Sequence, residues 1–318
     1  MSAPTTLRIA MLGMIPGNGH PYSWSAIVNS FDRAAMSRCP YSAILNYLGP
    51  LKEADVCIPG AQVTHIWTDK PEEAPEVAAA SLIPNIVAKP EDVIGHVDAV
   101  MISTDDGFDH VRRARPFIEA GLPVFIDKPL ATSIEELNTF IGWHKAGAKF
   151  LSSSGMRYAP ALDPLLADPT ALGDLRWISS TSAKAWENYG IHALEPVFCL
   201  LGPGFESARL ESRPGLEVAH LQHTSGAQVN LPLIYDGGAS FGRMQICGTG
   251  GVANLHLNDT YTAFRRQMLA FIDFARTGKA AYPFADTVEM MCVLIAGLKS
   301  RAEGGRRVTI AEIKTTLI

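Results

Sequence analysis

The sequence predicts an α/β protein in which a parallel sheet with helices on both faces precedes an α+β domain with an open, mostly antiparallel sheet. Strand and helix patterns alternate from Leu7 to about residue 130, as parallel sheets require, because crossover helices join their strands. Between residues 175 and 257, short segments alternate polar and apolar residues, as antiparallel strands with one open face do. The 318 residues suffice for two domains, expected at 1–130 and 131–318.

Composition and charge exclude several classes of protein. No run approaches the roughly 20 apolar residues that span a membrane. The net charge of -5 argues against a nucleic-acid-binding surface. Five dispersed cysteines, without a CxxC pair or a signal segment, predict reduced thiols and a cytoplasmic location. Neither HExxH nor a cysteine–histidine cluster is present, so we expect no metal site.

The first strand, Leu7 to Leu12, enters a glycine-rich turn, and a helix is expected from Tyr22 to Phe31. Such a turn can hold a phosphate, because glycines let the backbone approach and the helix N-terminus offers N–H groups. The usual GxGxxG spacing is absent, so an ordinary glycine loop stays an alternative. The candidate cofactor-binding residues in this turn and at the helix start are Gly13, Gly17, Gly19, His20 and Ser23.

The second strand, Val63 to Asp69, ends in an acid. An acid at this position accepts hydrogen bonds from the adenosine ribose and disfavours a 2′-phosphate, which favours NAD over NADP. Asp69 lies further than the usual ~20 residues from the glycines; an insertion with several turns, at about residues 31–60, accounts for the excess. Asp69 can equally cap the helix that follows Lys70. Thr104, after a buried strand ending at Ile102, is a further cofactor candidate.

A buried strand, Val124 to Ile126, ends in Asp127, Lys128 and Pro129. Open α/β sheets bind ligands at the carboxyl ends of their strands, so Lys128 stands at a functional position. Pro129 disfavours the helical conformation at Lys128 and so holds it at the strand tip. A solvated lysine at a strand exit is the alternative.

The remaining elements are assigned by periodicity and by capping residues. Helices are expected over 72–81, 110–120, 133–146, 261–277 and 286–303. Strands are expected over 85–87, 175–182, 207–212, 217–224, 228–234, 240–247 and 252–257, and a strand with its exit over 150–158.

Several motifs resemble one known family. The sequence Glu119 to Ala131 is similar to EAGKHVxxEKPLA, and Gly155 to Pro160 is similar to GFNRRFxP. Gly190 to Glu195 is similar to GxHxxD, and these motifs occur in the family's order. The chain therefore resembles the Gfo/Idh/MocA oxidoreductases, over most of its length outside residues 31–60.

The resemblance implies an N-terminal Rossmann-type parallel sheet plus a C-terminal α+β domain whose outer sheet face makes homodimers or homotetramers. It implies an NAD(P)-dependent enzyme that oxidises a hydroxyl of a sugar, sugar acid or cyclitol. By position, Lys128 binds the reacting hydroxyl beside the nicotinamide, and His192 is the general base. Candidate substrate-binding residues are Tyr158, Trp186 and Tyr189 as aromatic walls, and Arg157 for a substrate carboxylate, unless it pairs with a nearby acid.

Three departures from the family pattern leave other functions open. Asn188 stands where the family has an aspartate, so it can orient a hydroxyl but cannot stabilise an imidazolium at His192. Asp105 and Asp106 replace the usual Thr-Pro-Asn continuation, and the glycine loop is altered. An NAD-assisted hydrolase, lyase or isomerase with an internal redox cycle is therefore one alternative, and a non-catalytic nucleotide-binding protein is another.

Overall fold

The first sheet of the structure has six parallel strands in the order β3-β2-β1-β4-β5-β6. The computed structural model describes residues 6–318. The parallel sheet predicted from the sequence is confirmed. The direction of the strand order reverses beside β1, so the loops after β1 and β4 flank the position where open sheets bind ligands. The strands are β1 (Leu7–Leu12), β2 (Ala61–Trp67), β3 (Asn85–Ile86), β4 (Ala99–Ile102), β5 (Val124–Ile126) and β6 (Phe150–Leu151).

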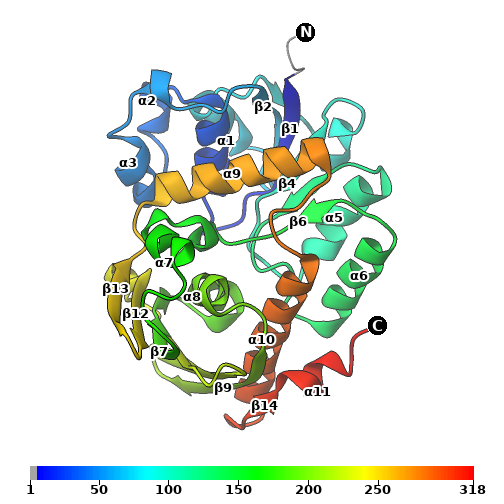
Figure 1. The fold of residues 1–318 in the computed structure, drawn as a ribbon. Helices are drawn as coiled ribbons and strands as arrows, with labels where there is room; N and C mark the ends of the chain where they lie inside the picture. Colours follow the sequence, from blue (N-terminus) through cyan, green and yellow to red (C-terminus); the bar gives the residue numbers. More distant parts are fainter. Residues whose placement is uncertain (1–5) are drawn as a thin grey trace.

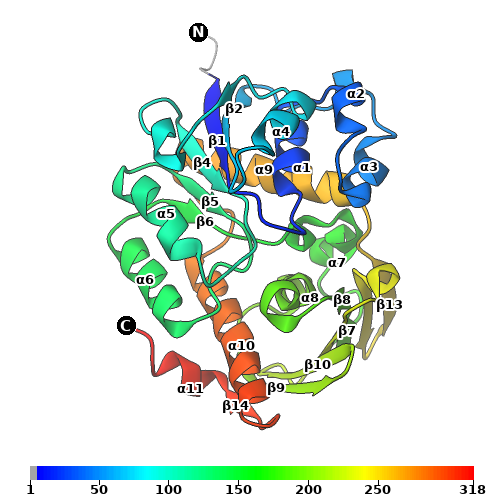
Figure 2. The ribbon, with the colours of Figure 1, turned by 180° about the vertical axis from the view of Figure 1, so that it is seen from behind.

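Helices cover both faces of this sheet. Successive side chains of β1 point to opposite faces: Met11 packs in one apolar core with α1 (His20–Asn29), α4 (Ala74–Ala80) and α9 (Thr260–Thr277). Leu12 packs in the other core, with α5 (His110–Glu119) and α6 (Ile134–Lys145). Helix α9 lies in front of the sheet in Figure 1 and behind it in Figure 2. A helix from late in the chain thus completes the N-terminal domain.

The segment between α1 and β2 forms the insertion expected at residues 31–60. It contains the short helices α2 (Arg33–Met36) and α3 (Ser42–Leu48), then a 3₁₀ turn at Glu53–Asp55. Asp32 begins α2 by accepting a hydrogen bond from the Ala35 amide. The segment packs against α1, α4 and α9, so it is an ordered part of the first domain.

The second sheet has eight strands and is mostly antiparallel, as predicted; β7 and β8 pair with β11 in parallel. Its inner face packs against α8 (Trp186–Leu201) and α10 (Phe284–Ala302), which lie inside the curve of the sheet (Figure 1). The sheet order is β13-β12-β7-β11-β10-β9-β14. The strands are β7 (Leu175–Ser180), β8 (Ser182–Ala183), β9 (Phe205–Arg213), β10 (Leu216–His223), β11 (Gln228–Ile234), β12 (Arg243–Gly248), β13 (Gly251–His256) and β14 (Val308–Thr309).

Two features differ from the expectation. Helix α8 was not predicted, because Gly190 and Pro196 interrupt its pattern; Gly190 is needed there, since a Cβ would lie 2.6 Å from the Trp186 ring. The first sheet also continues to β6. The domain division at residue 130 stays a proposal, and the strand pairing favours a limit after Leu151.

No helix within residues 6–318 combines the length and apolar character that membrane crossing requires.

Candidate active site

Lys128 lies at the carboxyl end of β5 with its side chain almost completely buried. Its ammonium group is 3.3 Å from a carboxylate oxygen of Asp105, which follows β4. It also lies 4.9 Å from the ring centre of Tyr189, on α8. Burial alone would lower the pKa of Lys128, but the Asp127 and Asp105 carboxylates outweigh it and raise that pKa above its ordinary value. The lysine is therefore a fixed positive charge.

Asp105 is the counter-ion of this lysine. Burial opposes its ionisation, yet Lys128, followed by His20, holds the pKa of Asp105 well below its usual range. The adjacent Asp106 instead accepts a hydrogen bond from the Phe108 amide in the following turn. Asp105 therefore belongs to the candidate site, whereas Asp106 stabilises the turn that follows β4.

Asp127 is buried and binds the glycine loop. Its carboxylate accepts hydrogen bonds from its neighbour's amide, that of Lys128, at 2.7 Å and from the Asn18 side chain at 3.2 Å. It also lies 2.7 Å from Nδ1 of His20, the first residue of α1. Because a carboxylate can only accept, His20 carries its proton on Nδ1. The His20 ring stacks on Trp24 at 4.2 Å between ring centres.

His192, on α8, lies across the cavity from the first domain. Its Nδ1 is 2.7 Å from the hydroxyl oxygen of Ser154, which also accepts a hydrogen bond from the Met156 amide. Burial, followed by the charges of Lys128 and His20, lowers the pKa of His192 well below its ordinary value. At neutral pH this imidazole is neutral.

Both histidines line one cavity of about 370 Å³ between the two domains. The first domain contributes the glycine loop, the start of α1 and the insertion, and the second contributes α8 and the turn before β12. The walls are aromatic and apolar, and the polar groups are few. The lining includes Gly17, Gly19, His20, Ser23, Tyr41, Ile44, Tyr47, Met156, Tyr189, His192, Phe241 and Phe264. A larger cavity of about 600 Å³ beside β6 is mostly apolar and lacks these imidazoles.

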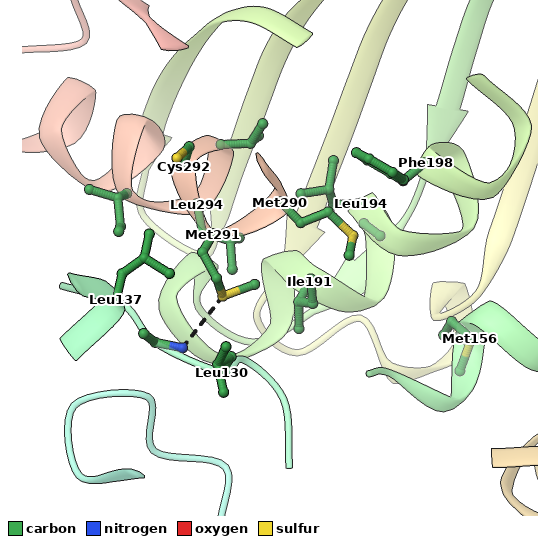
Figure 3. Packing of buried hydrophobic residues seen from close by; sticks show 14 of the residues in the cluster. Leu130, Leu137, Met156, Ile191, Leu194, Phe198, Met290, Met291, Cys292 and Leu294 are labelled. Atoms are coloured by element: carbon green, nitrogen blue, oxygen red, sulfur yellow. Dashed lines mark hydrogen bonds between the residues drawn. The ribbon is translucent and has the colours of Figure 1, made fainter. Parts of the chain in front are cut away.

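A packed core supports this side of the site. Leu130, two positions after Lys128, and Ile191, just before His192, belong to one buried cluster with residues of α10 (Figure 3). The Ala131 amide contacts the Met291 sulfur at 3.4 Å, so the chain leaving β5 is fixed against α10. The two site residues are therefore held by one rigid body of side chains.

The cofactor side of the site lies at the ends of β1, β2 and β4. Gly13 has a φ of +95°, and a Cβ there would lie 2.7 Å from the Thr104 methyl group, so this tight turn requires glycine. The Thr104 hydroxyl is buried and has no hydrogen-bond partner within residues 6–318. Gly17, also at positive φ, faces open space. An orphan hydroxyl beside an open glycine loop fits a bound dinucleotide.

Asp69 is already engaged in this structure. Its carboxylate accepts a hydrogen bond from the Met14 amide at 2.9 Å and forms an ion pair with Arg113 at 2.7 Å. It does not cap α4, whose first turn begins at Ala74. A ribose bound here would share Asp69 with Arg113, a guanidinium of the kind that accommodates 2′-phosphates in NADP sites.

Four other predicted site residues lie outside the cavity wall. Trp186 is completely buried in the second domain, where its indole donates to the Leu294 carbonyl, so it does not reach the cavity wall. Arg157 pairs with the buried Glu195 and lies 4.0 Å over the Tyr282 ring, which makes it a structural cation. Tyr158 packs in the apolar core of the first domain. Asn188 makes no side-chain hydrogen bond within residues 6–318 and does not line the cavity.

Several residues of the site were not predicted. Asp105 and Asp127 were noticed in the sequence but not as partners of Lys128 and His20. Tyr41, Tyr47 and Phe264 carry no motif, and no local pattern places the insertion and α9 against the glycine loop. Only the packing of these segments reveals them.

Comparisons with known proteins agree with this geometry. Residues 7–151 match the family model described as "Oxidoreductase family, NAD-binding Rossmann fold". No curated protein gives a match. Apo scyllo-inositol dehydrogenase from Lactobacillus casei has a TM-score of 0.75 at 15% identity, covering 97% of this chain and 99% of that one. The same enzyme with bound NAD(H) and scyllo-inositol has a TM-score of 0.73 at 16% identity, covering 96% and 100%.

A myo-inositol dehydrogenase from Corynebacterium glutamicum has a TM-score of 0.71 at 19% identity, covering 96% of this chain and 98% of that one. Such likenesses extend over both domains and establish the shared fold. The family match covers the parallel sheet, the glycine loop and Lys128. Residues 7–151 therefore match the Gfo/Idh/MocA family model, and both domains share the fold of the solved dehydrogenases.

Proposed function

We propose that the chain is an NAD-dependent dehydrogenase that oxidises a hydroxyl group of a sugar, sugar acid or cyclitol. One observation carries this proposal: two imidazoles line a cavity beside the glycine loop of an NAD-binding domain, and the buried ammonium of Lys128 lies behind its Tyr189 wall. Oxidation of a hydroxyl needs a proton acceptor and a charge that stabilises the oxygen as the proton leaves. The imidazoles of the cavity provide the acceptor, and Lys128, beside the cavity residue Tyr189, provides the charge.

The nicotinamide, when bound, supplies the acceptor for the hydride of the substrate carbon. The residues expected to hold the cofactor are Gly13, Gly17, Gly19, Ser23, Asp69 and Thr104. Lys128 stabilises the developing negative charge on the substrate oxygen. The hydroxyl proton passes to one of the two imidazoles that line the cavity: the family motif favours His192, and His20 is the other. Asn188 orients the substrate only if binding brings it to the cavity.

The aromatic wall supports a polyol ring as the substrate. Tyr189 and Phe241 from the second domain face Tyr41, Tyr47 and Phe264 across the cavity. Aromatic faces pack against the C–H faces of sugars and cyclitols, while the few polar groups fix their orientation. The solved Lactobacillus casei relative with bound scyllo-inositol is consistent with this class. We further propose that the insertion selects among polyols, because it forms one side of the wall.

The test is a titration of the purified protein with NAD and NADP, followed by a screen of sugars, sugar acids and cyclitols for NADH formation. Binding of NAD and turnover of a polyol support the proposal. Absence of binding by either nucleotide contradicts it.

One observation favours a second reaction. Two imidazoles line the same cavity, whereas a simple oxidation needs one proton acceptor. The second can serve an internal redox cycle, in which NADH formed first is consumed again during elimination, hydrolysis or isomerisation. Product formation without net NADH would identify that cycle, and stoichiometric NADH would exclude it.

We also propose a homodimer or homotetramer that forms through the outer face of the second sheet, in the cytoplasm. The inner face of β11 is buried under α8 and α10, whereas Gln228 and Asn230 on its outer face are at least partly exposed. The five cysteines are free, as in a reducing compartment. Light scattering of the purified protein measures the oligomeric state.

A further inference from the structure

The two imidazoles of the cavity have different partners. His20 is held by the Asp127 carboxylate, whose side chain is only 1% exposed, whereas His192 is held by the Ser154 hydroxyl. No carboxylate contacts His192 within residues 6–318, and Asn188 occupies the position where the motif would supply one. His192 thus has no carboxylate partner, whereas His20 has one in Asp127.

The partners also fix which ring nitrogen is free. The Nδ1–H of His20 donates to Asp127, so Nε2 is its unprotonated nitrogen in the neutral form. The Ser154 hydroxyl accepts from the Met156 amide, and the only acceptor for its own proton within residues 6–318 is Nδ1 of His192. The tautomer of neutral His192 that satisfies the Ser154 hydroxyl is therefore the one with its proton on Nε2. His20 presents a proton acceptor and His192 presents a donor.

We propose that His20, supported by Asp127, receives the proton of the substrate hydroxyl, and that His192 donates a hydrogen bond to the substrate. This inference rests on the proposed dehydrogenase function and assigns the proton acceptor within it. An imidazolium forming on His20 is stabilised by the carboxylate at its other nitrogen, as in the histidine–aspartate pairs of hydrolases.

The charges around His20 favour this role. Asp127 and Lys128 face it from the end of β5, and Asp105 lies nearby at the end of β4. His192 approaches from α8, and Asn18 bridges the loop to Asp127. Trp24 and Phe264 enclose the ring. Two carboxylates thus offset the single ammonium, and the side chain remains 18% exposed, so a proton can leave to solvent.

The step balances with the groups already named. The substrate O–H bond breaks and its proton goes to Nε2 of His20. The oxidised nicotinamide, when bound, would accept the hydride of the C–H bond, and the C–O bond would become a carbonyl. The substrate is oxidised, NAD is reduced, and His20 returns its proton to solvent.

The first experiment compares His20→Ala with His192→Gln, each measured for NAD affinity, kcat and KM. His20→Ala should lower kcat by about 10²- to 10⁴-fold, the usual contribution of general base catalysis. Added imidazole should restore part of that loss, and NAD affinity should change only a few-fold. His192→Gln, which keeps a donor, should mainly raise KM and should not respond to imidazole. His20→Gln serves as the conservative variant if His20→Ala folds poorly.

The inference is overturned if His20→Ala keeps wild-type kcat, or if imidazole rescues only a His192→Ala variant. A structural role for His20 would lower activity without imidazole rescue, so that result also overturns it. Asp127→Asn should lower kcat at least tenfold, because an amide cannot stabilise the imidazolium.

A second measurement does not depend on turnover. Nitrogen-15 NMR of the folded protein at neutral pH should show the Nδ1–H form of His20 and the Nε2–H form of His192. The opposite assignment for either ring overturns the inference even if the enzyme is active. Failure to bind NAD or to oxidise any polyol contradicts the proposed function instead. In that case the NMR measurement still tests the tautomers on which the His20 assignment rests.

Discussion

The ammonium of Lys128 lies 3.3 Å from the carboxylate of Asp105, and both side chains are almost fully buried. The pair joins the ends of β4 and β5, two adjacent strands of the first sheet. Such a pair places one positive charge behind the cavity residue Tyr189 and balances it with a buried carboxylate. It also explains why an acid is present where the family pattern has none.

Lys128→Met should reduce turnover by at least about 10³-fold, since a preorganised charge of this kind commonly contributes several kcal/mol to catalysis. NAD affinity should change little. Each single variant, Lys128→Met or Asp105→Asn, should destabilise the fold by about 3–5 kcal/mol, because it leaves a buried charge unpaired. Denaturant unfolding should show that the double variant loses less than the sum of both. Full additivity would contradict the pairing.

Asp69→Asn should move cofactor preference toward NADP by about tenfold, which corresponds to ~1.4 kcal/mol. The change removes the charge that repels a 2′-phosphate and frees Arg113, which now pairs with Asp69 at 2.7 Å. Titration with both nucleotides measures the ratio. Arg112→Ala is the control, because that side chain is 71% exposed and pairs with Asp109. An unchanged ratio in Asp69→Asn would place the ribose elsewhere.

Tyr47→Phe should raise KM for the substrate several-fold and leave stability unchanged or slightly improved. Its hydroxyl is buried in the cavity wall without a hydrogen-bond partner in the described chain, although Ser23 is near. Removing an unsatisfied buried hydroxyl costs the fold nothing, whereas a substrate would lose a bond of about 1 kcal/mol. Steady-state kinetics and thermal unfolding measure the two effects.

Tyr282→Phe provides the matched comparison. This hydroxyl donates to the Ser152 carbonyl at 2.7 Å outside the cavity. The variant should therefore lose stability and keep its KM, the reverse of Tyr47→Phe. An unaltered KM in Tyr47→Phe would remove this residue from the substrate site.

Glu195→Gln should destabilise the protein by about 3–5 kcal/mol, because Arg157 would remain buried without its partner. Burial raises the pKa of Glu195, while Arg157 opposes that rise. Denaturant unfolding gives the change in free energy. Asp163→Asn is the control: its pair with Arg266 is about half exposed and should contribute no more than ~1 kcal/mol. Similar losses of unfolding free energy in both variants would show that the buried Arg157–Glu195 pair stabilises the fold no more than the exposed pair does.

Acidification should destabilise the wild type partly through His192. Its pKa is lowered in the folded state, so the unfolded chain binds the proton more readily. The stabilising contribution is present above about pH 6.5, the ordinary value, and is lost as the pH falls below it. Thermal unfolding of His192→Asn should therefore depend less on pH between about pH 7 and pH 5 than that of the wild type. Replacement of the exposed His220 is the control.

The sequence alone determined the two sheets, their order along the chain, and Lys128 at the end of β5. Local patterns carry this information, since strand and helix periods and capping residues act over a few positions. The family motifs added His192. The sequence pattern does not predict helix α8, because Gly190 is present to make room for the Trp186 ring, a contact that periodicity cannot reveal.

Only the tertiary structure decided which charges meet. Asp105 and Lys128 are 23 positions apart, and His20 and Asp127 are 107 apart, so their pairing depends on which strands are neighbours. The same packing brings the insertion and α9 to the glycine loop, and it turns Arg157 and Trp186 away from the site into the core. Residue types can be read along a chain, but distance and burial determine whether an acid, a base or an aromatic ring takes part in chemistry.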